Sequence, residues 1–118
     1  MINAIQILLV DDSPHFINAA RDYLLMQPIV ARVETAFNGE EALQKAQDKD
    51  FDIILLDLNL PGKSGLQLIP EFRDKYPVTK IIIVSNLDEN NYGAASIKAG
   101  ADAFVHKSDL IKTLLVTI

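Results

Sequence analysis

Polar side chains of three kinds directly follow short apolar runs at four points in the chain. Two carboxylates stand together as Asp11 and Asp12, a third is Asp57, and the hydroxyl of Ser85 and the ammonium group of Lys107 follow two later runs. Carboxylate oxygens are the ligands that hard divalent cations prefer, and hydroxyl and ammonium groups can bind phosphoryl oxygens. The chemistry that this combination predicts is phosphoryl transfer.

Each of these residues also has an ordinary explanation when taken alone. An acid such as Asp12 after a strand commonly caps a helix, a serine there is commonly a turn residue, and a single lysine is usually solvated. The combination is unusual, because three carboxylates about 5 Å apart repel one another by about 3 kcal/mol per pair at an effective dielectric of about 20. A fold that gathers them should have a cation that neutralises them.

Hard oxygen ligands favour Mg²⁺ as that cation, and Mn²⁺ could substitute for it. Asp57 would attack phosphorus as a carboxylate nucleophile and form an acyl phosphate. The metal, Ser85 and Lys107 would stabilise the negative charge of the group in transfer.

The apolar runs that precede these residues have the composition of β-strands. Three runs are apolar without alternation, as expected of central parallel strands that are covered on both faces, whereas the run at 29–36 alternates with polar residues and fits an edge of the sheet. The predicted strands are Ile5–Val10, Ile29–Ala36, Ile53–Leu56, Ile81–Val84 and Ala103–Val105.

Segments with helical spacing separate the predicted strands. The first opens at Asp12-Ser13-Pro14, where either polar residue could cap the helix and the proline fits the first turn. Its inward face should carry Phe16, Ala20, Tyr23 and Leu24. The second helix should open at Asn38-Gly39, and the third should open at Ser64-Gly65 and end at Pro77. The fourth should span about Glu89 to Ala99, and the fifth should run from about Ser108 to the chain end.

Five strands that alternate with five helices predict an open, doubly wound α/β sandwich. Right-handed crossovers leave the carboxyl ends of parallel strands at one edge of the sheet, where ligands bind at the topological switch point. The polar residues that follow the strands should therefore meet at that edge.

The bulk composition fits one compact globular domain. The chain has 118 residues, of which 49% are hydrophobic, no cysteine, and a net charge of −5. The absence of cysteine excludes disulfides and thiolate metal sites, and the negative charge disfavours direct binding of nucleic acid by this domain. No apolar run approaches the length of a membrane span and the N-terminus lacks the basic start of a signal peptide, so we expect a cytoplasmic protein.

The chain resembles the receiver domain of two-component response regulators, the CheY-like superfamily, along its whole length. The matching segments are Leu9-Val10-Asp11-Asp12-Ser13-Pro14, Asp57-Leu58-Asn59-Leu60-Pro61-Gly62-Lys63-Ser64-Gly65, Ile82-Ile83-Val84-Ser85 and the stretch from Ala99 to Lys107. The resemblance implies a flavodoxin-like (βα)5 fold with a five-stranded parallel sheet in the order 2-1-3-4-5. It also implies that residues 1–118 form a receiver domain, the N-terminal part of a longer regulator.

The resemblance assigns a role to each site residue. Asp57 would be the phosphoacceptor, and Asp12, Asp57 and the backbone carbonyl of Asn59 would bind the metal, with Asp11 acting largely through bound water. Ser85 and Lys107 would contact the phosphoryl oxygens. In the implied switch, Ser85 moves toward the phosphate and Phe104 turns inward.

The resemblance also implies partners and an output. The phosphoryl donor would be a sensor histidine kinase or a phosphotransfer protein. The output would come from a C-terminal domain, with transcription regulation as one form, or from a homodimer formed through the fourth and fifth helices. The apolar excess in residues 110–118 is further reason to expect a partner chain or a following domain at the last helix.

Two alternatives and one departure from the family pattern stay open at this point. A haloacid dehalogenase type of phosphatase would need a second Asp where the chain has Asn59, and a receiver-like binding module would not be phosphorylated. The family generally has a very small residue after the hydroxyl residue, whereas this chain has Asn86, which we expect to narrow access to Asp57. We expect His15 and His106 to be exposed and assign no role to either.

Overall fold

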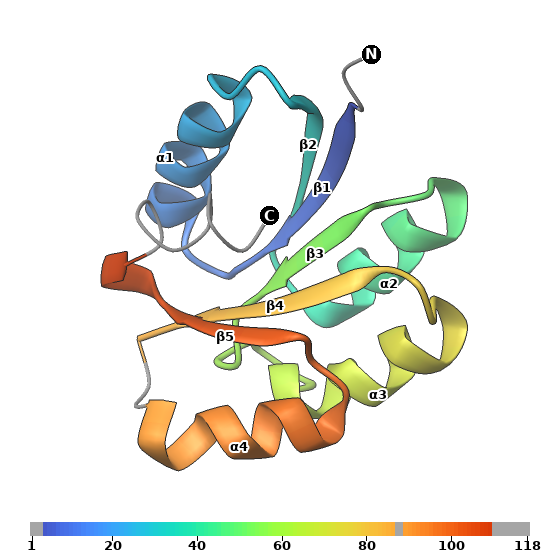
Figure 1. The fold of residues 1–118 in the computed structure, drawn as a ribbon, viewed down its shortest axis with the longest axis vertical. Coiled ribbons are helices and arrows are strands. Elements are labelled where there is room, and N and C mark those ends of the chain that lie inside the picture. Colours follow the sequence, from blue (N-terminus) through green and yellow to red (C-terminus); the bar gives the residue numbers. More distant parts are fainter. Residues whose placement is uncertain (1–3, 87–88, 110–118) are drawn as a thin grey trace.

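The computed structural model describes residues 4–86 and 89–109 of the chain. Five parallel strands form one sheet in the order β2-β1-β3-β4-β5 (Figure 1). The strands are β1 (Ile5–Val10), β2 (Val30–Ala36), β3 (Ile53–Leu56), β4 (Lys80–Ser85) and β5 (Ala103–His106). The predicted fold class and strand order are confirmed, including the position of the alternating strand β2 at one edge.

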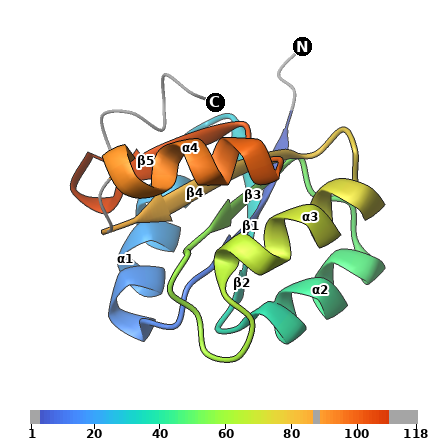
Figure 2. The ribbon, with the colours of Figure 1, turned by 90° about the horizontal axis from the view of Figure 1, so that it is seen from below.

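Helices cover both faces of this sheet, as a doubly wound fold requires. Ile17, Ala20 and Leu24 of α1 pack in one buried cluster with alternate residues of the central strands. Residues of α2 and α3 pack in a second cluster on the other face, and Figure 2 shows these two helices across the strands from α1. The helices are α1 (Pro14–Leu25), α2 (Gly39–Asp48), α3 (Gly65–Lys75) and α4 (Glu89–Ala99).

Polar caps begin three of these helices where the sequence predicts them. The Ser13 side chain accepts from the backbone N–H of Phe16, so Ser13 and not Asp12 is the N-cap of α1. Asn38 accepts from the backbone N–H of Glu41 at 2.8 Å, and Ser64 forms a capping box at the start of α3. The cap position of Ser13 leaves Asp12 available for other contacts.

The inward face of α1 differs from the predicted one. Ile17 is 1% exposed and takes a core position that the prediction gave to Phe16, while Phe16 and Tyr23 are only partly buried. Phe16 lies one residue earlier on the helix, about 100° around its axis, and therefore faces the carboxyl edge of the sheet instead of the centre of its face.

The last predicted helix and the apolar surface expected on it fall in residues 110–118, which lie outside the described residues. Lys107–Asp109 form a short 3₁₀ turn after β5. None of the helices in residues 4–86 and 89–109 has the length and apolar character of a membrane span.

Arg73, near the end of α3, joins the amino ends of β4 and β5. Its guanidinium group donates to the carbonyls of Gly100 (3.0 Å) and Thr79 (2.7 Å) and to a carboxylate oxygen of Asp102 (2.6 Å). The same Asp102 oxygen accepts from the backbone N–H of Ile81 at 2.8 Å. This network fixes the edge of the sheet opposite the strand ends where Asp57 and Ser85 lie.

Candidate functional site at the carboxyl edge of the sheet

The register of the central strands brings Asp11 and Asp57 next to each other. Val10 pairs with Leu56 at the ends of β1 and β3, so each aspartate is the first residue beyond its strand. The backbone N–H of Asp57 donates to the Val10 carbonyl at 3.0 Å, which continues the ladder by one step. Two carboxylates thus leave neighbouring strands at the same level of the sheet.

Asp12 completes a cluster of three carboxylates. One oxygen each of Asp11, Asp12 and Asp57 lies within 4.8 Å of the others. Asp11 and Asp57 are 1% and 4% exposed, whereas Asp12 is exposed at the mouth of the site. The separation agrees with the one expected from the sequence, and two of the three carboxylates are largely buried.

Lys107 supplies a positive charge to this cluster. Its Nζ lies 2.7 Å from Asp11 Oδ2 and 3.6 Å from Asp57 Oδ2, and its side chain is only 15% exposed. The ammonium group also lies over the ring of Phe16, 4.4 Å from the ring centroid. Lys107 therefore compensates part of the carboxylate charge that the sequence argument left to a metal ion.

The electrostatic environment leaves Asp57 a stronger base than an ordinary aspartate. Burial, and after it the charge of Asp11, raise the pKa of Asp57, and Lys107 and the backbone N–H of Asn59 offset this only in part. Burial would lower the pKa of Lys107, but its hydrogen bond with Asp11 and the charge of Asp57 outweigh burial and the pKa is raised. The lysine is charged at neutral pH, and the site holds more negative than positive charge.

A pocket of about 430 Å³ opens onto the carboxylates. Six of its lining residues are ones that the sequence points to: Asp12, Asp57, Asn59, Ser85, Asn86 and Lys107. The other two, Leu60 and Pro61, belong to the loop after β3. Ser85 is the last residue of β4 and is 1% exposed. A small anion in this pocket would meet a carboxylate, a hydroxyl and an ammonium group together.

Gly65 sets the distance between α3 and the strand that carries Asp57. A Cβ atom at this position would lie 2.4 Å from the Asp57 carbonyl oxygen and 2.7 Å from the Leu58 Cα. The backbone N–H of Gly65 donates to the Leu58 carbonyl at 2.9 Å. A larger residue would push the start of α3 away from the strand that carries Asp57.

The structure brings the predicted site residues together, with one exception. Asp11, Asp12, Asp57, Asn59, Ser85 and Lys107 all lie at this edge. Phe104 is half-buried in β5 and packs against the core cluster on the α2 and α3 face, and it does not line the pocket. Its role as a switch stays a prediction.

Sequence reasoning missed two contacts of the site. Helical periodicity predicts Phe16 as a core residue, because it does not separate adjacent positions on the rim of an apolar face, whereas the ring of Phe16 contacts the Lys107 ammonium group. The sequence predicts an exposed His106, yet this residue is half-buried and its ring lies within hydrogen-bonding distance of the Asn86 carbonyl. Its position as the last residue of β5, opposite Ser85, was the only available signal.

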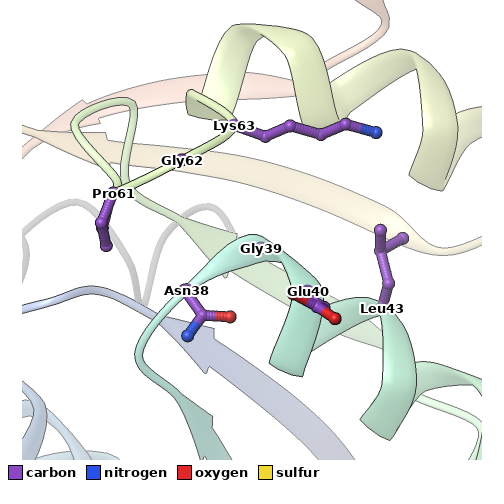
Figure 3. A pocket seen from close by; sticks show the side chains of 7 residues that line it. All are labelled: Asn38, Gly39, Glu40, Leu43, Pro61, Gly62 and Lys63. Carbon is purple, nitrogen blue, oxygen red and sulfur yellow. The ribbon is translucent and has the colours of Figure 1, made fainter.

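A second surface pocket lies between the start of α2 and the loop after β3 (Figure 3). It has a volume of about 510 Å³, and its lining includes Asn38, Glu40, Leu43, Pro61 and Lys63. Glu40 and Lys63 carry opposite charges, and Lys63 forms an ion pair with Glu71 outside the lining. The residues that line this pocket do not include a cluster of carboxylates with a hydroxyl and an ammonium group like the one around Asp57.

The donor set at the carboxyl edge fits a hard divalent cation. It offers three carboxylate oxygens within 4.8 Å of one another, with Asp12 exposed to approach from solvent. Mg²⁺ prefers such oxygen ligands and retains several waters, for which the open pocket has room.

Comparisons with known proteins show the family to which the chain belongs. The model of the response regulator receiver domain family matches residues 7–118. The nitrate/nitrite response regulator protein NarL of Escherichia coli K12 is 35% identical over 112 residues, which cover 92% of this chain and 52% of NarL. The transcriptional regulatory protein DegU of Brevibacillus brevis is 30% identical over 105 residues, covering 89% of this chain and 44% of DegU. The chain spans about half the length of these relatives.

Solved structures show the same likeness. The response regulator TrrA of Thermotoga maritima, in complex with Mg²⁺ and a beryllium fluoride, superposes with a TM-score of 0.85 at 34% identity, covering 96% of this chain and 95% of TrrA. A CheY-like receiver domain protein of Methanospirillum hungatei gives a TM-score of 0.85 at 27% identity, covering 98% and 94%. The dehalogenase and binding-module alternatives are not favoured. The chain belongs to the response regulator receiver domain family, and its function is phosphorylation-dependent signalling in a two-component system.

Proposed function

We propose that Asp57 is the phosphoacceptor of this receiver domain. The observation that carries the proposal is its position: a buried carboxylate at the end of the central strand β3, 3.6 Å from the Lys107 ammonium group and open to a pocket that Asp12 and Ser85 also line. A nucleophile needs an accessible oxygen and groups nearby that stabilise the charge of the incoming phosphoryl group. Asp57 meets both requirements.

The transfer forms one bond and breaks another. An Asp57 carboxylate oxygen bonds to phosphorus as the bond between phosphorus and the donor breaks, and the donor leaves with the electron pair. With a phosphohistidine donor, the leaving group is an imidazole that takes up a proton. The raised pKa of Asp57, caused first by its burial, makes the carboxylate a better nucleophile as long as it stays ionised.

The other residues act on charge and orientation. Lys107 and Ser85 would donate hydrogen bonds to the phosphoryl oxygens, and Asp11 would keep the Lys107 ammonium group in place through their 2.7 Å contact. Asp11, Asp12, Asp57 and the backbone carbonyl of Asn59 would hold Mg²⁺, or Mn²⁺ in its place. When bound, the metal would supply positive charge that neutralises the carboxylates and the phosphoryl oxygens.

Asn59 bears on how long the acyl phosphate lasts. Asn59 stands two residues after Asp57, the sequence position at which a phosphatase of the dehalogenase type has a second aspartate, and an amide neither gives nor takes a proton at neutral pH. The chain would therefore lose its phosphoryl group slowly, by its own Mg²⁺-dependent hydrolysis. Such a lifetime suits a signal, and no turnover of a separate substrate is expected.

The proposed partners follow from family membership. A sensor histidine kinase or a phosphotransfer protein would donate the phosphoryl group. Because relatives such as NarL and DegU are about twice as long as the matched region, this receiver would form the N-terminal part of a longer regulator, with transcription regulation as its output. Ser85 and Phe104 would carry the phosphorylation signal to the surface around α4, where an output domain or a second copy of the chain would bind.

Beryllium fluoride, a stable mimic of a phosphoryl group, tests the site without any turnover. We expect its addition with Mg²⁺ to shift the backbone amide NMR signals of Asp57, Ser85 and Lys107 in a saturable way. Asp57→Asn should remove these shifts, because the variant lacks the carboxylate oxygen that binds beryllium. Asp74→Asn, which changes an exposed acid on α3, is the matched control and should respond like the wild type.

Equal shifts in the wild type and in Asp57→Asn would contradict the proposal. Shifts that appear without Mg²⁺ at the same concentration of beryllium fluoride would contradict the metal assignment but leave Asp57 as the acceptor.

A further inference from the structure

The side chain of His106 connects the end of β5 to the loop that follows β4. His106 pairs with Ser85 in the parallel register of the two strands. Its Nε2 atom lies 3.1 Å from the backbone carbonyl oxygen of Asn86, the residue directly after Ser85. Its Nδ1 atom lies 2.8 Å from the Ser108 hydroxyl oxygen.

The contacts of the ring determine which nitrogen carries the proton. The backbone N–H of Ser108 donates to Nδ1 at 3.2 Å, so Nδ1 is an acceptor. In a neutral imidazole the other nitrogen then bears the hydrogen. Nε2 therefore donates to the Asn86 carbonyl, which can only accept. All contacts of the ring are satisfied in this one tautomer.

The bond to Asn86 acts at the point where the chain leaves the sheet. The ladder between β4 and β5 ends with the pair of Ser85 and His106. The His106 ring extends the connection between the two strands by one more residue. Because Ser85 lies directly before the tethered carbonyl, its backbone is held from both sides.

We propose that His106 is a positioning residue that keeps the Ser85 hydroxyl in the pocket of Asp57 by fixing the backbone of Asn86. The inference rests on the proposed function, in which Ser85 donates to a phosphoryl oxygen. With the backbone held, only the side chain of Ser85 has to rotate when a phosphoryl group arrives. Preorganised donors of this kind stabilise developing charge without a cost of reorganisation.

Two variants separate the bond to Asn86 from the contacts with Ser108. His106→Gln places an amide N–H near the position of Nε2 and can still donate to the Asn86 carbonyl. His106→Asn is shorter, can accept from Ser108 in place of Nδ1, and cannot reach Asn86. His15→Gln, at the exposed histidine of α1, is the matched control.

The test measures the rate of phosphorylation of the full chain by acetyl phosphate with Mg²⁺ over a range of donor concentrations. His106→Asn should lower the maximal rate by about two- to tenfold, the range that one neutral hydrogen bond supplies, with little change in the donor concentration at half-maximal rate. His106→Gln and His15→Gln should stay close to the wild type. Melting temperatures identify a variant that has lost its fold.

A second measurement uses the wild type alone and does not depend on how a variant folds. The ¹⁵N NMR shifts of the His106 ring should report a protonated Nε2 and an unprotonated Nδ1 at pH 8. The opposite tautomer would overturn the inference, as would a folded His106→Asn variant that reacts at the rate of the wild type. A wild type that takes up no phosphoryl group would instead contradict the proposed function, and the inference with it.

Discussion

The ammonium nitrogen of Lys107 lies 4.4 Å above the centroid of the Phe16 ring while it contacts Asp11 at 2.7 Å. The ring belongs to the first turn of α1 and the lysine follows β5, so two distant parts of the chain fix one charge. An aromatic face attracts a cation through its quadrupole, by about 0.5–2 kcal/mol depending on exposure. Phe16 thus limits the positions that the ammonium group can take beside the carboxylates.

Replacement of Phe16 should weaken phosphorylation without abolishing it. Phe16→Leu keeps an apolar side chain but removes the ring face, and we expect the phosphorylation rate with acetyl phosphate to fall by about two- to thirtyfold, the rate equivalent of a cation–π contact. Phe16→Tyr retains the ring and should react at nearly the wild-type rate. If both variants lose the same factor, the ring face is not what positions Lys107.

The charge on Asp57 should destabilise the chain when no divalent cation is present. Burial raises the pKa of Asp57 above its ordinary value of 3.8, so the folded chain binds this proton more tightly than the unfolded chain does. The ionised carboxylate therefore costs folding free energy at neutral pH, and the cost is relieved as the pH falls through the raised pKa toward the ordinary value. Asp57→Asn removes the charge at any pH.

Thermal denaturation followed by circular dichroism checks this expectation. With a chelator at pH 7, Asp57→Asn should melt at a higher temperature than the wild type, and the difference should shrink as the pH is lowered toward 4. Mg²⁺ should raise the melting temperature of the wild type more than that of the variant. A wild type that is the more stable of the two at pH 7 without a cation would contradict the electrostatic account of the site.

Arg73 should matter for stability and not for phosphoryl transfer. Arg73→Lys keeps the charge but cannot reproduce the planar set of donors that contacts Gly100, Thr79 and Asp102 together, and we expect a loss of about 2 kcal/mol in the free energy of unfolding. Arg21→Lys, at a partly exposed arginine that forms an ion pair with Asp22 at 3.7 Å, should cost less than about 0.5 kcal/mol. Urea denaturation measures both, and equal losses would remove the special role of Arg73.

Asn86 lines the pocket through its position after Ser85, and its side chain is exposed. Asn86→Ala should therefore speed phosphorylation by acetyl phosphate, the loss of the phosphoryl group, or both, because a smaller side chain widens the approach to Asp57. The backbone carbonyl that His106 contacts stays in place in this variant. Unchanged rates for both reactions would show that Asn86 does not restrict access.

Much of the fold could be predicted from the sequence because its signals are local. The unbroken aliphatic runs before Asp11, Asp57 and Ser85 require cover on both faces, and this places β1, β3 and β4 in the centre of the sheet. Caps such as Asn38 and Ser64 mark helix starts by hydrogen bonds that reach only three residues. The helix predicted from Ser108 stays a prediction, since residues 110–118 lie outside the described part.

The site could be predicted because strand ends and parallel topology together determine where residues meet. Asp11, Asp57, Ser85 and Lys107 lie at the carboxyl ends of four different strands, and the common edge brings them together whatever the side-chain details. The contacts of Phe16 and His106 could not be predicted in the same way. Each depends on the rotation of one side chain relative to an element distant in sequence, and periodicity carries no information on that.

The most direct test of the central claim is the location of a phosphoryl group on the chain. Incubation with Mg²⁺ and acetyl phosphate, followed by mass spectrometry of the intact chain and of its peptides, should show one phosphoryl adduct on the peptide that contains Asp57. The adduct should be absent from Asp57→Asn and present in the control Asp74→Asn. A wild type that takes up no label, or a variant Asp57→Asn that is labelled as fast as the wild type, would contradict the assignment of Asp57 as the phosphoacceptor.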